Sequence, residues 1–142
     1  WPETKLENLS WSKISEEKMD WDSAVEYCEN LNEDDHSDWT LPTISQLRTL
    51  IKNCPVTETG GVCKVADSCL SFGNCRNDAC SGCSDSASDG RYSKLGDAYS
   101  FWSSSEQSDN ADNAWSVYFY YGDVSNPAKI GNNGYSYVRC VH

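Results

Sequence analysis

The segment Ala-Trp-Ser-Val-Tyr-Phe-Tyr-Tyr-Gly, residues 114–122, decides the fold that we expect for this chain. Its apolar residues share one parity: Trp115, Val117 and Phe119. The residues of the other parity are Ser116, Tyr118 and Tyr120. Successive side chains of a β-strand point to opposite faces, so the pattern predicts a strand with its apolar set on a core and its tyrosines toward solvent. Gly122 and Asp123 predict the turn that ends this strand.

The loops around this strand are rich in Ser, Asn, Asp, Gly and Tyr. Tyrosine supplies a rigid amphipathic ring and the small polar residues supply adaptable hydrogen bonds, a mixture typical of binding surfaces. Near the chain end, the same parity argument points Val138 and Cys140 inward and Tyr137 and Arg139 outward. We predict a ligand-binding surface within residues 103–137; the alternative is an ordinary solvated surface. The candidate residues are Ser105, Asn110, Asp112, Asn113, Ser116, Tyr118, Tyr120, Tyr121, Asn126, Asn132, Asn133, Tyr135 and Tyr137.

Length and charge narrow the class of protein. A chain of 142 residues with six Trp, eight Tyr and three Phe predicts one folded domain over residues 1–142. The formal net charge of −11 repels phosphate backbones and anionic lipid, so we expect no nucleic-acid partner. No apolar run approaches the ~20 residues that a membrane-spanning helix needs. The chain begins at Trp1, and we expect a processed or trimmed N-terminus, with a lost leader or lipid anchor left open.

The eight cysteines are an even number and a high density, which indicates an oxidising compartment and disulfides. Six of them form a Cys-rich insertion, residues 54–83, that has few aliphatic residues and therefore needs crosslinks for order. Cys80-Ser-Gly-Cys83 has the spacing of half a zinc knuckle, but no His is near, so we favour disulfides. Six cysteines allow fifteen pairings. If they pair locally, Cys28 and Cys140 must pair with each other. The six are Cys54, Cys63, Cys69, Cys75, Cys80 and Cys83.

Three elements are predicted before the Cys-rich insertion. Residues 9–14 predict a short strand with Leu9 and Trp11 on one face. Asp20 is a good N-cap for a first helix. The apolar positions of that helix are Trp21, Ala24, Val25, Cys28 and Leu31. Thr43 and Gln46 form a capping box for a second helix that ends near Asn53. Its apolar stripe is Ile44, Leu47, Leu50 and Ile51. After the Cys-rich insertion, residues 89–97 predict a turn-rich connector.

Metal binding and catalysis find little support. The polar loop 32–38 could supply oxygens to a hard cation such as calcium, but its carboxylates lack the spacing of an EF-hand, and a solvated acidic loop is the better interpretation. We therefore predict no cofactor and no metal, with calcium open. His36 and His142 lie in that loop and at the chain end, without an implied nucleophile. Residues 103–105 are serines without a nucleophile elbow. We expect them to bond the backbone while Trp102 and Trp115 pack in the core, so we predict no enzyme.

Five blocks in order, spanning residues 11–142, resemble the Lcl C-terminal domain, which is found at the ends of bacterial surface proteins and lipoproteins, including collagen-like adhesins. The blocks are Trp-Asp-Ser-Ala-Val-Glu-Tyr-Cys (21–28), Trp-Thr-Leu-Pro-Thr-Ile-Ser-Gln-Leu (39–47), Phe-Trp-Ser-Ser-Ser (101–105), Ala-Trp-Ser-Val-Tyr-Phe (114–119) and Val-Arg-Cys-Val (138–141). Where this family usually has Arg, the chain has Thr40 and His142, which puts an ion pair in doubt. The calcium and sugar motifs of animal C-type lectins are absent.

The resemblance implies an α+β, C-type-lectin-like fold. In it two helices pack on a small, twisted, mostly antiparallel sheet, the N- and C-terminal strands pair, and the middle is irregular and disulfide-rich. It implies a secreted or cell-surface module that binds protein or carbohydrate on another cell or surface. Some members are hypervariable proteins diversified by retroelements, and the composition of residues 108–137 suits that role. The alternatives are an oxidase like the formylglycine-generating enzymes, which needs an unpaired cysteine, and a structural end-cap of a longer surface protein.

Overall fold

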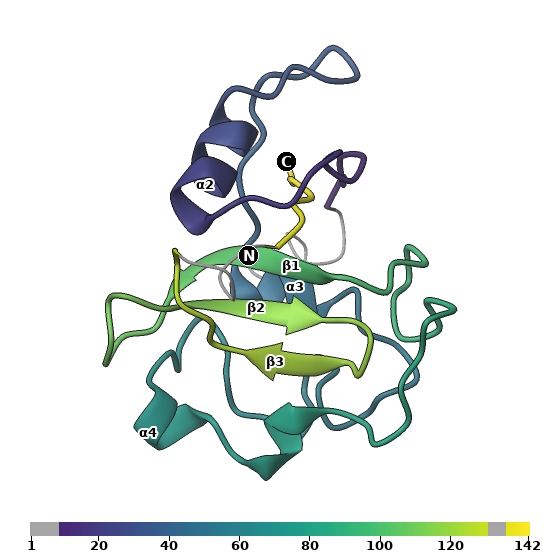
Figure 1. Ribbon diagram of the computed structural model, residues 1–142, viewed down its shortest axis with the longest axis vertical. Helices are drawn as coiled ribbons and strands as arrows, with labels where there is room; N and C mark the ends of the chain where they lie inside the picture. Colours follow the sequence, from purple (N-terminus) through teal and green to yellow (C-terminus); the bar gives the residue numbers. More distant parts are fainter. Residues whose placement is uncertain (1–8, 131–135) are drawn as a thin grey trace.

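A three-stranded antiparallel sheet of order β1-β2-β3 lies at the centre of the structure, a computed structural model that describes residues 9–130 and 136–142 (Figure 1). The strands are β1 (Ser100–Glu106), β2 (Ala114–Tyr118) and β3 (Asp123–Ser125). The helical elements are α2 (Trp21–Glu29), α3 (Ile44–Arg48), α4 (Phe72–Cys75) and the 3-10 turn η1 (Asp78–Ser81). Helices and an antiparallel sheet confirm the α+β class.

Each face of the sheet contributes to a separate core cluster. Val117 pairs with Phe101 on one side and with Val124 on the other, and this row joins the larger cluster, which includes α3. The smaller cluster packs Trp102 of β1 against Ala24 and Cys28 of α2. Trp115, Val117 and Phe119 are fully buried, which confirms the inward parity of β2. Trp102 is fully buried as well, as expected.

Both predicted helices exist, and their N-caps are those read from the sequence. The Asp20 side chain accepts a hydrogen bond from the Ser23 amide, and Thr43 with Gln46 forms the complete capping box. The second helix is shorter than predicted, because after Arg48 the chain changes to hydrogen bonds that span three residues. Leu50 and Ile51 are still buried there, as the apolar stripe predicts. Asn53, with a φ of 61°, ends this run.

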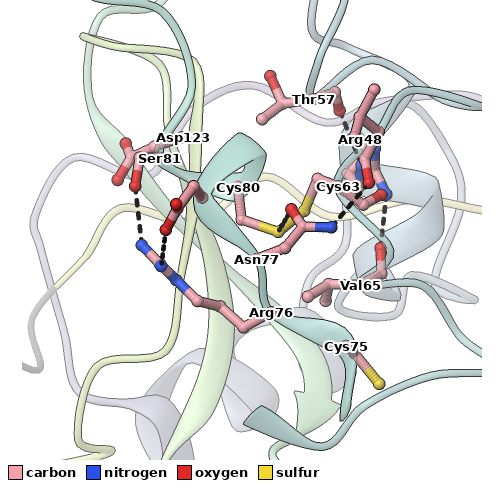
Figure 2. Close-up of a disulfide and its surroundings, with 12 residues drawn as sticks. Arg48, Thr57, Cys63, Val65, Cys75, Arg76, Asn77, Cys80, Ser81 and Asp123 are labelled. Carbon is pink, nitrogen blue, oxygen red and sulfur yellow. Dashed lines mark hydrogen bonds and ion pairs between the residues drawn. A yellow bond between two sulfur atoms is a disulfide. The ribbon is translucent and has the colours of Figure 1, made fainter. Parts of the chain in front are cut away.

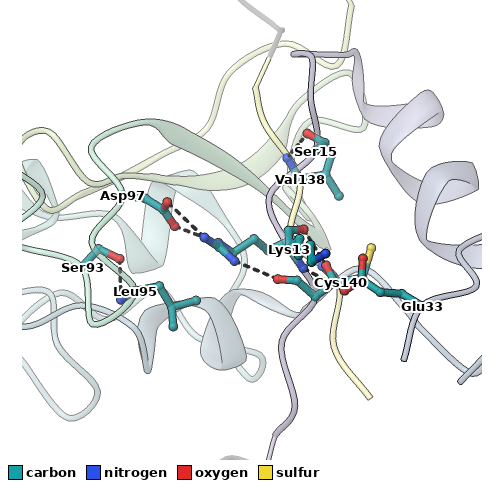
Figure 3. A network of polar contacts seen from close by, with 10 residues as sticks. Lys13, Ser15, Glu33, Ser93, Leu95, Asp97, Val138 and Cys140 are labelled. Atoms are coloured by element: carbon teal, nitrogen blue, oxygen red, sulfur yellow. Dashed lines mark hydrogen bonds and ion pairs between the residues drawn. The ribbon is translucent and has the colours of Figure 1, made fainter. Parts of the chain in front are cut away.

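The two ends of the described chain lie side by side. Backbone amides of Ser12 and Ser15 donate to the carbonyls of Cys140 and Val138, each at 2.9 Å. Figure 3 shows Ser15 beside Val138. This confirms the pairing of the N- and C-terminal segments, although the predicted strand at 9–14 is only an isolated bridge of Trp11 to Val141. Trp11 is half-buried against the larger core cluster, and the fully buried side chains of this segment are Ser12 and Ser15. Their hydroxyls accept from the amides of Cys140 and Val138.

All eight cysteines are paired, as predicted. The bonds are Cys28–Cys140, Cys54–Cys83, Cys63–Cys80 and Cys69–Cys75. The half zinc knuckle is excluded, because Cys80 and Cys83 bond to different partners. The middle of the chain holds α4 and η1, so it is less irregular than expected.

A buried arginine organises the Cys-rich insertion from within. Arg48 is 4% exposed and its side chain donates to four carbonyls. Figure 2 shows Arg48 with Thr57, Cys63 and Val65 beside the Cys63–Cys80 disulfide. The accepting residues are Thr57, Glu58, Cys63 and Val65. Burial lowers the pKa of Arg48. Three disulfides and the hydrogen bonds of one guanidinium thus stabilise the Cys-rich insertion, which has few aliphatic residues.

Turns connect the remaining pieces. Residues 89–97 are the predicted connector, in which Gly90 and Gly96 have positive φ. At Gly90 a Cβ would lie 2.1 Å from the Gly96 carbonyl oxygen, so only glycine fits. The turn after β2 spans residues 119–122 and ends at Gly122, close to its predicted position. Within residues 9–130 and 136–142, no helix is long and apolar enough to span a membrane.

Candidate functional site

Five tyrosines gather where β2 ends, and we call them the tyrosine patch: Tyr99, Tyr118, Tyr120, Tyr121 and Tyr137. Tyr118 is the last residue of β2, and the following turn carries Tyr120 and Tyr121. The rings of Tyr118 and Tyr120 stack at 5.7 Å between centroids, and Tyr121 meets Tyr120 edge-on at 5.0 Å. Such offset and edge contacts are favourable, so these rings hold one another in place.

The second half of the tyrosine patch consists of Tyr99 and Tyr137, which lie beside β1. Tyr99 and Tyr137 lie 4.9 Å apart between ring centroids, and Tyr99 is 50% exposed. The Lys18 ammonium is 5.8 Å from the Tyr137 ring centroid, within the range of a cation–π contact. Phe101 packs against Tyr137 at 6.3 Å and connects the pair to the core.

A pocket of about 210 Å³ lies between the two halves. Its lining residues are Lys18, Ala98, Tyr99, Ser100, Tyr118 and Ser136. The hydroxyls of Ser100 and Ser136 share a hydrogen bond of 2.9 Å. The pocket therefore offers ring faces, hydroxyls and one ammonium group. These groups can stack on a ligand and hydrogen-bond to it, and no nucleophile–base pair is among them.

An aspartate that the sequence analysis did not single out borders the patch. Asp123 is the first residue of β3 and pairs with Tyr118 in the sheet register. Its Oδ2 atom accepts a hydrogen bond from Ser125 at 2.9 Å, and its buried Oδ1 atom has no partner among the described residues. Burial raises the pKa of Asp123. Burial, with the neighbouring Tyr120, Tyr121 and Asp123, also raises the pKa of Tyr118.

The sequence held a signal for Asp123. The residue follows the Gly122 turn directly, so a hairpin register places it opposite the end of the strand at Tyr118. No sequence pattern predicted that Lys18 and Tyr99 belong to the site. They come together because the folded chain places the paired chain ends next to the start of β1.

Ser116 corrects the predicted orientation of β2. It was expected to face solvent with Tyr118, but it is fully buried. In the sheet it lies between Trp102, which is also fully buried, and Ser125, so the middle of β2 is covered on both faces. Its hydroxyl has no hydrogen-bond partner among the described residues. Tyr118 and Tyr120 are half-buried rather than fully outward.

A second group of candidate residues lies at the opposite end of β2. The loop between β1 and β2 carries exposed Asn110 and Asp112 and half-buried Asn113. A strand rises about 3.3 Å per residue, which separates this loop from Tyr118 by roughly 16 Å. The side-chain amides of Asn113 and Asn126 both donate to Gln107 Oε1, at 3.2 and 2.8 Å. These amides hold the loop together, so the predicted surface divides into two groups.

The remaining candidate residues also have a definite place. Ser105 is 9% exposed, and its hydroxyl accepts from the Ile44 amide at 2.9 Å, so it caps α3. Ser103 donates to the Trp115 carbonyl, as expected of a serine that bonds backbone. The predicted candidates Asn132, Asn133 and Tyr135 lie outside the described residues.

One residue near the C-terminal end, Arg139, is placed differently from the prediction. Arg139 was expected to face outward, but its side chain is 15% exposed and pairs with Asp97. The guanidinium donates twice to this carboxylate, at 2.8 and 3.2 Å, and once to the Ser12 carbonyl (Figure 3 labels Asp97). Arg139 therefore stabilises the pairing of the chain ends and is not available to a ligand.

Potential metal ligands lie together at a different place from the tyrosine patch. His36, Asp38 and His142 are the one such group of three within residues 9–130 and 136–142. His36 and His142 were expected in a polar loop and at the chain end. The structure stacks their imidazole rings, with centroids 4.1 Å apart.

Comparison with protein families gives one match. The family model described as the Lcl C-terminal domain matches residues 3–142, which is almost the whole chain. No curated protein matches the chain.

Proposed function

The chain belongs to the Lcl C-terminal domain family, and from that premise we propose that it is an extracellular or cell-surface module for ligand recognition. It binds through the tyrosine patch and the pocket between Tyr99 and Tyr118. Its fold is C-type-lectin-like, with α2 and α3 packed on the sheet and the chain ends tied by the Cys28–Cys140 disulfide.

The observation that carries this proposal is a cluster of five tyrosines, two of which, Tyr99 and Tyr118, line a pocket of about 210 Å³ in a disulfide-bonded scaffold. Rings that already pack on one another lose little conformational freedom on binding, so a ligand does not have to order them. Tyr121 and Tyr99 are 39% and 50% exposed, which leaves ring surface for contact. Tyrosine combines apolar area with a hydroxyl and is enriched at recognition surfaces for that reason.

The ligand class that suits this surface is protein or carbohydrate. Both present flat or ridged apolar surface with hydrogen-bonding groups, which tyrosine rings, serine hydroxyls and the Lys18 ammonium complement. The net charge of −11 disfavours polyanions such as nucleic acid.

The proposed location outside the cell rests on the disulfides. Four disulfides in one small domain are typical of oxidising compartments. The same pairing counts against an oxidase that needs a reactive cysteine, because each of the eight sulfurs is already bonded. A purely structural end-cap does not account for exposed tyrosines beside a pocket, so we prefer ligand binding as the proposal.

A glycan and cell-surface array, probed with the 142-residue chain, tests the proposal. We expect the chain to bind and Tyr121→Ala to reduce its affinity at least tenfold, because the exposed Tyr121 ring is available to contact the ligand. Since the ring is exposed, its removal leaves the core intact. Phe72→Ala is the matched control: Phe72 is 44% exposed, and its amide bonds Asp109 in the loop at the opposite end of β2. Equal binding by the folded Tyr121 variant and the unmodified chain would refute the tyrosine patch as the binding surface.

A further inference from the structure

We propose that His36, Asp38 and His142 form a binding site for a divalent transition-metal ion of the Zn²⁺ class. The three side chains come from two segments, the 33–39 loop and the C-terminal end of the described chain. One potential ligand atom from each lies within 4.8 Å of the other two. This site is separate from the tyrosine patch, and its test does not depend on the proposed function.

The Asp38 carboxylate lies near both imidazoles without a hydrogen bond to either. The Asp38 carboxylate reaches both imidazoles: Oδ1 is 3.6 Å from His36 Nδ1, and Oδ2 is 3.9 Å from His142 Nδ1. Both separations exceed the 3.2 Å or so of an N–H···O hydrogen bond. Two ligand atoms bound to one tetrahedral Zn²⁺ at 2.0–2.1 Å lie about 3.3 Å apart. His36 and Asp38 are exposed and His142 is half-buried, with its imidazole stacked on that of His36 at 29° between the ring planes. Turning the exposed His36 ring out of this stack, with a shift of the Asp38 carboxylate, places one ligand atom from each residue around one ion.

The neighbouring structure holds the ligands in position. Glu33 and His36 exchange backbone hydrogen bonds of 3.1 and 3.0 Å, which close the loop into a tight turn. The Trp39 indole donates to the His36 carbonyl at 3.1 Å, and its ring meets the His142 imidazole edge-on at 4.5 Å between centroids. His142 exchanges two backbone hydrogen bonds with Ser10, both of 3.1 Å. Both histidines are thus fixed at the backbone.

The ligand types select the class of metal. Two imidazoles and one carboxylate suit Zn²⁺, Cu²⁺ or Ni²⁺, whereas Ca²⁺ and Mg²⁺ require an all-oxygen shell. This differs from the calcium that the acidic loop 32–38 first suggested. Bound metal would join the 33–39 loop to the C-terminal end, close to the Cys28–Cys140 disulfide, and would stabilise the folded chain by mass action.

The experiment is a Zn²⁺ titration of the 142-residue chain, read by calorimetry and by the imidazole NMR signals. The chain has only two histidines, so each imidazole can be followed separately. We expect both sets of signals to shift together with one equivalent of Zn²⁺. His36→Ala and Asp38→Asn should each weaken binding at least about tenfold, because even loss of a group that only orients a ligand costs about ten- to a hundredfold. Asp35→Asn, which removes a charge from the same loop without removing a ligand, should bind normally.

Three results would overturn the site. One is Zn²⁺ binding that His36→Ala leaves unchanged. Another is an equal loss in Asp35→Asn, which would indicate general attraction to acidic groups. The third is binding of Ca²⁺ as tight as that of Zn²⁺, which would exclude imidazole ligation. Because the His36 side chain is half exposed, its removal leaves the fold intact, and unchanged NMR signals elsewhere verify this.

Discussion

Cys28 on α2 and Cys140 in the C-terminal segment are joined by a disulfide across 112 residues, with their Cα atoms 5.6 Å apart. Both residues are fully buried in the smaller core cluster beside Trp102. The bond therefore closes almost the whole chain into one loop and fixes the helix against the paired chain ends. The other three disulfides close loops of 6 to 29 residues within the Cys-rich insertion.

Removing this long-range bond should cost much more stability than removing a short one. In the loop-entropy model, Cys28→Ala/Cys140→Ala loses about 4–5 kcal/mol of unfolding free energy, and Cys69→Ala/Cys75→Ala loses about 2 kcal/mol. Urea unfolding of the two double variants measures both values. Equal losses would show that strain or packing, and not loop closure, determines what these disulfides contribute.

Arg48 should be one of the least replaceable side chains in the chain. Arg48→Met leaves the buried carbonyls of Thr57, Cys63 and Val65 without this donor, whereas the Glu58 carbonyl keeps the Gly61 amide. Each buried acceptor left unpaired costs about 1–3 kcal/mol, so we expect a loss of at least about 3 kcal/mol. Lysine should not rescue it, because one ammonium cannot reproduce the planar fork. The control is Arg91→Met on the surface, which should stay within about 0.5 kcal/mol. A small effect at Arg48 in urea unfolding would contradict its role.

Asp109 should make the fold sensitive to acid. Hydrogen bonds from the Phe72 amide, the Gln107 side chain and the Gly73 amide lower its pKa to about 2. A carboxylate with a lowered pKa in the folded state stabilises the fold fully above its unfolded value, near 4, and loses this contribution as pH falls toward 2. The melting temperature should therefore fall less steeply from pH 4 to pH 2 in Asp109→Asn. Parallel curves would refute the assignment.

Ionisation of Asp123 should destabilise the fold, whereas ionisation of Asp109 stabilises it. Burial raises its pKa, so its charged form costs folding free energy above the raised value, and this cost disappears as pH falls toward the unfolded value near 4. Asp123→Asn should melt higher than the unmodified chain at pH 7, and the difference should vanish by pH 4. A variant that melts lower at pH 7 would show that the carboxylate is stabilised by a partner.

Local patterns in the sequence predicted the elements that depend on local forces. The caps at Asp20 and Thr43 and the alternation at Trp115, Val117 and Phe119 arise from neighbouring residues, so spacing alone revealed them. The Cys28–Cys140 bond followed from counting once local pairing of the other six was assumed. Their own pairing could not be read, because it depends on the path of the chain.

Features that depend on distant contacts escaped the sequence. Ser116 has the parity of an outward residue, but tertiary packing buries both faces of β2 at that point. Arg139 is on the outward parity too, and its partner Asp97 is 42 residues away in the chain. The predicted site corresponds to two separate groups of residues, because residues before and after β2 lie at opposite ends of the strand. His36 and His142 lie together because Thr40 and Val141, 101 residues apart in the chain, exchange backbone hydrogen bonds.

The most direct test of the account is the dissociation constant of Tyr118→Ala/Tyr121→Ala for the surface or glycan that the unmodified chain binds. Loss of central interface aromatics costs about 2 kcal/mol or more, so the constant should rise at least about thirtyfold, while Phe72→Ala should stay within about twofold. A non-reducing gel and the thermal midpoint establish that the double variant is folded. An unchanged dissociation constant in that folded variant would contradict recognition through the tyrosine patch.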